Sequence, residues 1–156
     1  MRPSLKPWLP VLLWMGFIFV MSTSVGGADH TSRIIEPLLR WLFPHLAAEN
    51  IELLHHGVRK AAHFTEYAVL ALLLQRALLR SRPDYRGPAG RVYTIAFSLA
   101  VIYATTDEFH QRFVAGRTSS ARDVLVDATG AGVALGVAAL AKNWRPRRDS
   151  NTRRPV

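Results

Sequence analysis

Charged residues leave four long gaps in the chain. Residues 8–28 and 92–106 contain no Asp, Glu, Lys or Arg, residues 124–141 contain only Asp127, and residues 61–79 are interrupted by His63, Glu66 and Arg76. A transmembrane helix needs about 20 predominantly apolar residues. The gaps therefore predict an all-α fold, a small bundle of four transmembrane helices with spans near residues 8–25, 61–79, 92–108 and 123–141. A soluble helical bundle is the alternative, because it can imitate one or two such segments.

Composition alone suggests a different protein. The 156 residues carry a net charge of +9, which fits a small basic domain that binds nucleic acid. The basic residues border the apolar segments, however, and no aromatic-basic motif accompanies them, so no nucleic-acid partner is predicted. The chain has no cysteine, which excludes disulfides, thiol nucleophiles and cysteine-ligated metals.

The first apolar segment has two interpretations. Arg2, Lys6 and the small residues near Ala28 resemble a cleaved signal peptide. Pro10 and two tryptophans lie inside the segment, and it is long enough to span, so we favour a retained helix.

The distribution of charge predicts the orientation. The N-terminus, the connection between the second and third spans, and the tail together hold 13 of the 20 Lys and Arg residues, but only two of the 11 acids. Basic residues in short loops favour the cytoplasmic side. We therefore predict a multi-pass protein of the cell membrane with both termini in the cytoplasm.

Two segments lie outside the predicted spans. Residues 34–43 have apolar side chains at helical spacing and end at Pro44, which predicts an external amphipathic helix at the membrane interface. A second helix is expected to begin at Asn50, with a possible bend at Gly57, and to run into the second span. Residues 1–141 thus form the membrane domain, and residues 142–156 a basic, disordered cytoplasmic tail that can touch anionic lipids.

With this topology, polar residues from all the spans meet at the outer boundary of the membrane. Ionisable residues at membrane depth are costly and by default face a bundle interior or an aqueous cavity. Helical spacing places Arg59, His63, Glu66 and Tyr67 on one side of a helix. Asp107 shares a face with His110 and Gln111. Asp123 shares a face with Asp127, and the repulsion between these two carboxylates must be neutralised by a basic side chain, a proton or a cation.

Other features have simpler interpretations. Gly132 and Gly136 form a small-residue face for close helix packing, within the chain or in a homo-oligomer. As an alternative to a role in a site, Asp107 and Glu108 mark the point where a helix leaves the membrane. The corresponding alternative for Asp123 is a helix cap. His55 and His56 are expected in a solvated loop or interface.

The sequence also resembles a known family. RKAAHFTEYAVL (Arg59–Leu70) and DEFHQRFVAGRTSSARDVLVDATG (Asp107–Gly130) resemble the two motifs of VanZ-like membrane proteins, and MSTS at Met21–Ser24 is similar to the end of that family's first helix. Two positions depart from the motifs: Ala115 stands where the family often has Pro, and Asp127 where it often has Asn. The resemblance implies a link to glycopeptide-antibiotic resistance, and to teicoplanin in particular, without implying a biochemical activity.

Three functions follow as hypotheses. The first is binding of, or action on, the lipid-linked or phosphorylated headgroup of a cell-envelope lipid, with Arg supplying phosphate contacts. The second is a membrane-embedded enzyme in which a histidine is the general base and carboxylates orient it or hold a divalent cation. The third is an ion or proton pathway lined by Glu66, Asp107 and Asp127, which needs an oligomer.

The candidate residues are as follows. Ligand contacts are predicted for Arg59, Lys60, His63, Tyr67, Asp107, Gln111, Arg117 and Asp123. Candidates for catalysis are His63, Glu66, Asp107, Glu108, His110 and Asp127. No cofactor motif and no tight metal signature is present, so neither a metal nor a cofactor is predicted; the expected partners are membrane lipids.

Overall fold

The protein is described by a computed structural model that covers residues 5–81, 87–115, 117 and 119–144. Within these residues the secondary structure is entirely helical, which confirms the all-α prediction. The α-helices are α1 (Leu9–Ser22), α2 (Ala28–Leu42), α3 (Ala48–Ser81), α4 (Ala89–Gln111) and α5 (Ala121–Trp144), and two short 3₁₀ helices, η1 (Lys6–Trp8) and η2 (Ser24–Gly26), flank α1.

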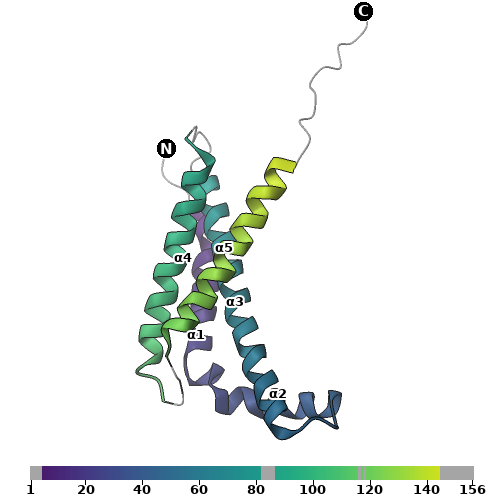
Figure 1. Cartoon of the computed structure of the whole chain (residues 1–156). Coiled ribbons are helices and arrows are strands. Elements are labelled where there is room, and N and C mark those ends of the chain that lie inside the picture. Colours follow the sequence, from purple (N-terminus) through teal and green to yellow (C-terminus); the bar gives the residue numbers. More distant parts are fainter. Residues whose placement is uncertain (1–4, 82–86, 116, 118, 145–156) are drawn as a thin grey trace, which may run out of the picture.

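Helices α1, α3, α4 and α5 run side by side as a bundle, and α2 lies across one end of it (Figure 1). Each bundle helix overlaps one of the four predicted spans. By length and composition, one helix in the described part of the chain can cross a membrane, over Ala121–Lys142. The segments Lys6–Ser22 and Ser24–Leu42 meet that criterion together, but they are bent by 67°. The four membrane crossings stay a prediction.

Helix α3 is longer than predicted. It begins at Ala48, so Asn50 is not its N-cap, and it continues through Gly57 without a break. Glu49 in the first turn is favoured by the helix dipole. A glycine inside a helix costs only about 1 kcal/mol, and no neighbouring element packs against Gly57. At 1.5 Å per residue, the 34 residues of α3 extend about 50 Å.

The amphipathic helix is confirmed as α2, but it begins at Ala28 rather than near Ile34. The backbone N–H and the Oγ1 hydroxyl of Thr31 both donate to the carbonyl oxygen of Gly27, at 3.0 and 2.9 Å, which stabilises the additional turn. Pro37 consequently lies inside the helix. Ile34, Leu38 and Trp41 are exposed on the apolar side of α2.

The core of the bundle is built from small side chains around α3, which packs most extensively against α5 and then against α4. At the closest point of α3 and α5, a Cβ atom on Gly130 would lie 2.2 Å from the carbonyl oxygen of Phe64. Glycine therefore permits this crossing. Most of the buried residues that α3, α4 and α5 contribute to this core are alanines, whose side chains are also small: Ala71, Ala77, Ala96, Ala100, Ala104 and Ala131.

Gly132 and Gly136 do not form the close packing face within the chain. A Cβ atom on Gly136 would meet nothing within 4 Å, and one on Gly132 would meet only the ring of Phe97 at 3.6 Å. The prediction is wrong for the bundle itself because these residues turn away from the α3–α5 contact that Gly130 makes. The same face as a homo-oligomer contact stays a prediction.

Helix α1 is joined to the bundle by hydrogen bonds as well as by packing. The indole N–H of Trp8 donates to Ser81 Oγ at 2.8 Å, and that of Trp14 to the backbone oxygen of Glu66 at 2.9 Å. The hydroxyl of Tyr103 on α4 donates to the backbone oxygen of Met15 at 2.7 Å. With Val11 and Ile18 buried, α1 is an integral part of the bundle.

The start of α1 and the end of α5 lie at the same end of the bundle, opposite α2 (Figure 1). The prediction of a disordered tail falls largely on residues 145–156, which lie outside the described residues. The exterior of the bundle is apolar: Leu12, Ile102, Leu125, Val137 and Leu140 are all exposed.

Candidate functional site

The end of the bundle next to α2 contains buried polar side chains from several helices. Ser22 on α1, Asp107, Glu108 and Gln111 on α4, and Asp127 on α5 are all buried. Because buried polar groups are costly unless they are paired, their concentration at one end marks this end as the candidate site.

The last turns of α4 hold two acidic side chains by different contacts. Gln111 Nε2 donates to Asp107 Oδ2 at 3.1 Å, which confirms that the two residues share a face. Glu108 is held by the segment that leads into α5: Ser120 N donates to Glu108 Oε2 at 3.0 Å, and Ser119 Oγ donates to the backbone oxygen of Glu108 at 2.7 Å. Oε1 of Glu108 has no hydrogen-bond partner among the described residues.

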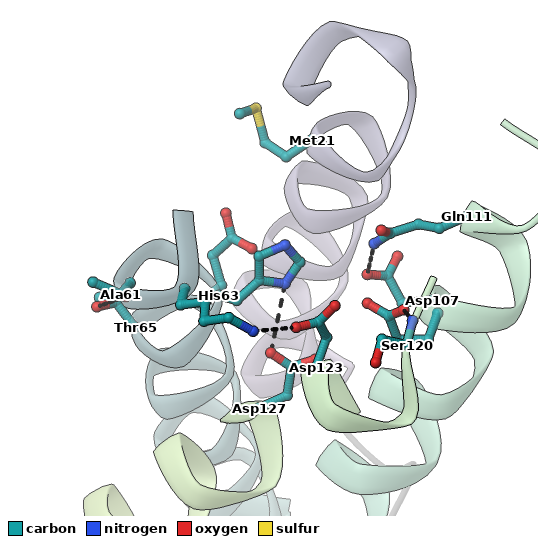
Figure 2. A network of polar contacts seen from close by, with 12 residues as sticks. Met21, Ala61, His63, Thr65, Asp107, Gln111, Ser120, Asp123 and Asp127 are labelled. Atoms are coloured by element: carbon teal, nitrogen blue, oxygen red, sulfur yellow. Dashed lines mark hydrogen bonds and ion pairs between the residues drawn. The ribbon is translucent and has the colours of Figure 1, made fainter. Parts of the chain in front are cut away.

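The two aspartates of α5 both reach α3, one helical turn apart. Lys60 Nζ donates to Asp123 Oδ1 at 2.7 Å, and His63 Nδ1 lies 3.5 Å from Asp127 Oδ1 (Figure 2). The predicted neutralisation by a base is thus found for Asp123. Asp127 is fully buried, and neither of its oxygens has a hydrogen-bond partner among the described residues.

Arg117 joins the loop after α4 to the end of α1. Its guanidinium donates to the backbone oxygens of Met21 and Ser22, the latter at 3.3 Å. Gly26 lies against the same segment, where a Cβ atom would collide with the Met21 carbonyl. Burial lowers the pKa of Arg117, and the positive charge of Arg59 lowers it further. An arginine nevertheless remains charged at neutral pH.

A cavity of about 200 Å³ lies between α1, α2, α3 and Arg117. One part of its wall is apolar, from Ile18, Met21, Ile35 and Val58. The other part is polar and charged: Ser22, Arg59, His63, Glu66, Asp107 and Arg117. The cavity therefore combines an apolar lining with cationic donors and with the acidic side chains of Glu66 and Asp107.

Five of the predicted site residues line this cavity, namely Arg59, His63, Glu66, Asp107 and Arg117. Glu108, Gln111 and Asp127 are buried at the same end of the bundle but do not line the cavity. Lys60 and Asp123 are paired with each other beside it.

Tyr67 and His110 lie apart from the cavity. Tyr67 is fully buried in the core, with its ring centroid 6.3 Å from that of Tyr103. The ring of His110 stacks at 4.8 Å on Phe19. Of the two alternatives for His55, a solvated loop or an interface, the structure shows an interface: His55 is buried, and its Nε2 lies 3.3 Å from Thr31 Oγ1, so it joins α3 to α2.

Several wall residues were not predicted from the sequence, among them Gly26, Thr31, Ile35 and Val58. Three of them belong to α2 and to the first turns of α3, and no pattern in the sequence shows that these segments fold back over the end of the bundle. The periodicity of residues 34–43 indicated a membrane-facing side for α2, but not that Ile35 faces a cavity.

The arrangement supports three kinds of chemistry. Arg59, Arg117 and His63 can bind an anion by charge-assisted hydrogen bonds. His63, with Asp127 behind it, resembles a general base and the carboxylate that orients it. His63, Glu108 and Asp127 also offer one ligand atom each within 4.8 Å of one another, as a cation site requires.

The fold and the site together define a small helical-bundle protein that keeps ionisable side chains buried beside a cavity at one end of its helices. A family model described as VanZ/LLP1 matches residues 8–142. The chain therefore belongs to the VanZ/LLP1 family. No curated protein and no solved structure matches the chain.

Proposed function

We propose that this protein is a multi-pass membrane protein whose cavity faces the outside of the cell and binds the phosphorylated or lipid-linked headgroup of an envelope lipid. The observation that carries the proposal is the composition of the cavity wall. Arg59, Arg117 and His63 line a cavity of about 200 Å³ together with the apolar side chains of Ile18, Met21, Ile35 and Val58. A headgroup with a phosphate at one end and a hydrocarbon chain at the other matches both parts of this wall.

The surface of the bundle supports placement in a membrane. Only 22% of the apolar window of α5 is buried inside the protein, whereas the core helix of a soluble protein is mostly buried. Exposed apolar side chains continue over α1 and α4. An apolar exterior around a polar interior suits a lipid environment better than water.

Helix α2 supports access from the lipid surface. It lies across the end of the bundle that contains the cavity (Figure 1), its exposed side carries Ile34, Leu38 and Trp41, and Ile35 lines the cavity. An amphipathic helix in the interface lies at the depth of the headgroups, so a lipid reaches the cavity without leaving its leaflet.

The binding test uses the full chain, purified in a neutral detergent, with farnesyl phosphate as the probe. We expect saturable binding, inhibition by excess inorganic phosphate, and much weaker binding of farnesol. Arg59→Ala should weaken binding about tenfold or more, because it removes charged hydrogen bonds worth about 1.5–3 kcal/mol. Arg112→Ala is the matched control: Arg112 is exposed and does not line the cavity. Equal binding by both variants would exclude this site.

The orientation has its own test, which the absence of native cysteine makes simple. Single cysteines at Arg40, which is exposed on α2 away from its apolar side, and at Ser150 are labelled in intact cells with a thiol reagent that does not cross membranes. We expect labelling at position 40 and protection at position 150. The reverse pattern would place the cavity in the cytoplasm.

A second candidate function is an enzyme that acts on the same headgroup. It is favoured by His63, which borders the cavity and has Asp127 at 3.5 Å on its other side. A base held by a buried carboxylate can accept a proton from water or from a headgroup hydroxyl. Release of phosphate or of a headgroup fragment from envelope lipids should then stop in His63→Ala and persist in His110→Ala. If the wild-type protein binds the headgroup but shows no turnover, the enzymatic function is excluded and only the binding function is retained.

A further inference from the structure

Three helices bring potential metal ligands to one point. His63 on α3, Glu108 on α4 and Asp127 on α5 each offer one atom, and these atoms lie within 4.8 Å of one another. Ligands bound to one metal ion at about 2.1 Å lie roughly 3–4 Å apart. Small rotations of the carboxylates close the remaining gap.

The same side chains lack other partners. Asp127 is 0% exposed and Glu108 is 4% exposed. Both oxygens of Asp127, Oε1 of Glu108 and Nδ1 of His63 have no hydrogen bond to any part of the chain that the structure describes. Buried polar atoms in proteins are nearly always bonded, so this cluster of unsatisfied atoms points to a missing ligand.

Two neighbouring cations already have partners. Lys60 is bound to Asp123 at 2.7 Å, and Arg117 donates to the carbonyls of Met21 and Ser22. Two buried carboxylates this close to each other repel strongly in a medium of low dielectric constant. A divalent cation between them would remove the repulsion and provide a partner for the unsatisfied atoms of His63, Glu108 and Asp127.

Glu108 is also oriented for such a role. The backbone N–H of Ser120 holds Oε2 at 3.0 Å, which leaves Oε1 as the unsatisfied oxygen. Hydrogen bonds of this kind commonly fix the carboxylates that bind metals.

We propose that His63, Glu108 and Asp127 form a binding site for a divalent transition-metal ion. One imidazole and two carboxylates, without sulfur, suit Zn²⁺ or Mn²⁺. Three protein ligands leave a coordination position for water or another oxygen ligand. Because His63 also lines the cavity, the ion would lie beside the space proposed for the headgroup. The metal site does not depend on headgroup binding.

The test uses the full chain in detergent, stripped with EDTA and then titrated with Mn²⁺ or Zn²⁺. Free Mn²⁺ is followed by electron paramagnetic resonance, and bound Zn²⁺ by elemental analysis after gel filtration. We expect about one equivalent per chain and a higher unfolding temperature with metal. Glu108→Gln should weaken binding about 100-fold, since loss of even an outer-shell partner costs 10–100-fold.

Glu52→Gln is the matched control, since Glu52 is an exposed acid on α3, the helix that also carries His63. Its affinity for metal should equal that of the wild-type protein. Asp127→Asn gives a second ligand variant if Glu108→Gln does not fold. A wild-type protein that retains no metal would overturn the proposal, and so would wild-type affinity for metal in both ligand variants, which would place the ion elsewhere. Farnesyl phosphate binding after EDTA treatment tests the headgroup proposal separately.

Discussion

The two ends of the bundle are built from the same helices but differ in the side chains that they bury. At the end where α3 finishes, Ala71, Leu74, Ala77, Ala96 and Leu135 pack without buried charge. At the end beside α2, Asp107, Glu108 and Asp127 are buried, and several of their oxygens have no hydrogen-bond partner among the residues that the structure describes. We infer that packing at the apolar end provides most of the folding stability of the bundle. The polar end lowers that stability, as binding and catalytic sites often do.

The largest expected effect comes from the α3–α5 crossing, on which both ends depend. Gly130→Ala places a methyl group against the backbone of Phe64, so the helices must separate, at a cost of about 3 kcal/mol or more. The measurement is thermal unfolding in detergent. Gly136→Ala is the control: it meets no neighbour and should raise stability by about 0.5–1 kcal/mol. Equal behaviour of the two variants would show that this crossing is not close-packed.

The second prediction compares how much one substitution at each end of α5 changes the stability of the protein. With EDTA present, Asp127→Asn should leave the unfolding free energy unchanged or raise it by about 1 kcal/mol, because a neutral amide costs less to bury than a carboxylate. Leu135→Asn, two turns further along α5, should lower it by about 2–3 kcal/mol. Chemical unfolding of both variants gives the comparison directly. If Asp127→Asn is the more damaging of the two, the polar end contributes stability after all.

The smallest effect is expected at the rim of the polar end. The ion pair of Lys60 and Asp123 is partly open, with side chains 38% and 25% exposed, and such pairs are worth about 0.2–1 kcal/mol. Lys60→Met should therefore cost less than 1 kcal/mol, and the cost should shrink further in high salt. A larger, salt-independent loss would mean that Lys60 also stabilises the interior acids.

Local patterns predicted the features that depend on one helix. Gaps between charges located the helices, and the spacing of Asp107 and Gln111 predicted a shared face that their hydrogen bond confirms. The i, i+4 spacing of Asp123 and Asp127 likewise predicted that both lie on one side of α5, and the structure shows that this side faces α3 (Figure 2).

Features that depend on contacts between helices were beyond the sequence. Nothing in the pattern around Gly130, Gly132 and Gly136 shows which glycine meets a neighbouring backbone. The burial of His55 depends on where α2 lies, which is set by the turn at Gly26. The grouping of His63, Glu108 and Asp127 joins three helices, so no spacing in the sequence resembles a metal motif.

The continuity of α3 has a mechanical consequence. A helix of 34 residues is about 50 Å long, whereas the hydrocarbon core of a bilayer is only about 30 Å thick. In the proposed orientation a good part of α3 therefore projects beyond the hydrocarbon, where His55 couples it to α2. Helix α3 is not broken at Gly57, so tilting of its projecting part by a partner or by membrane curvature also moves Arg59 and His63. The shape of the cavity therefore depends on the shape of the membrane surface around it.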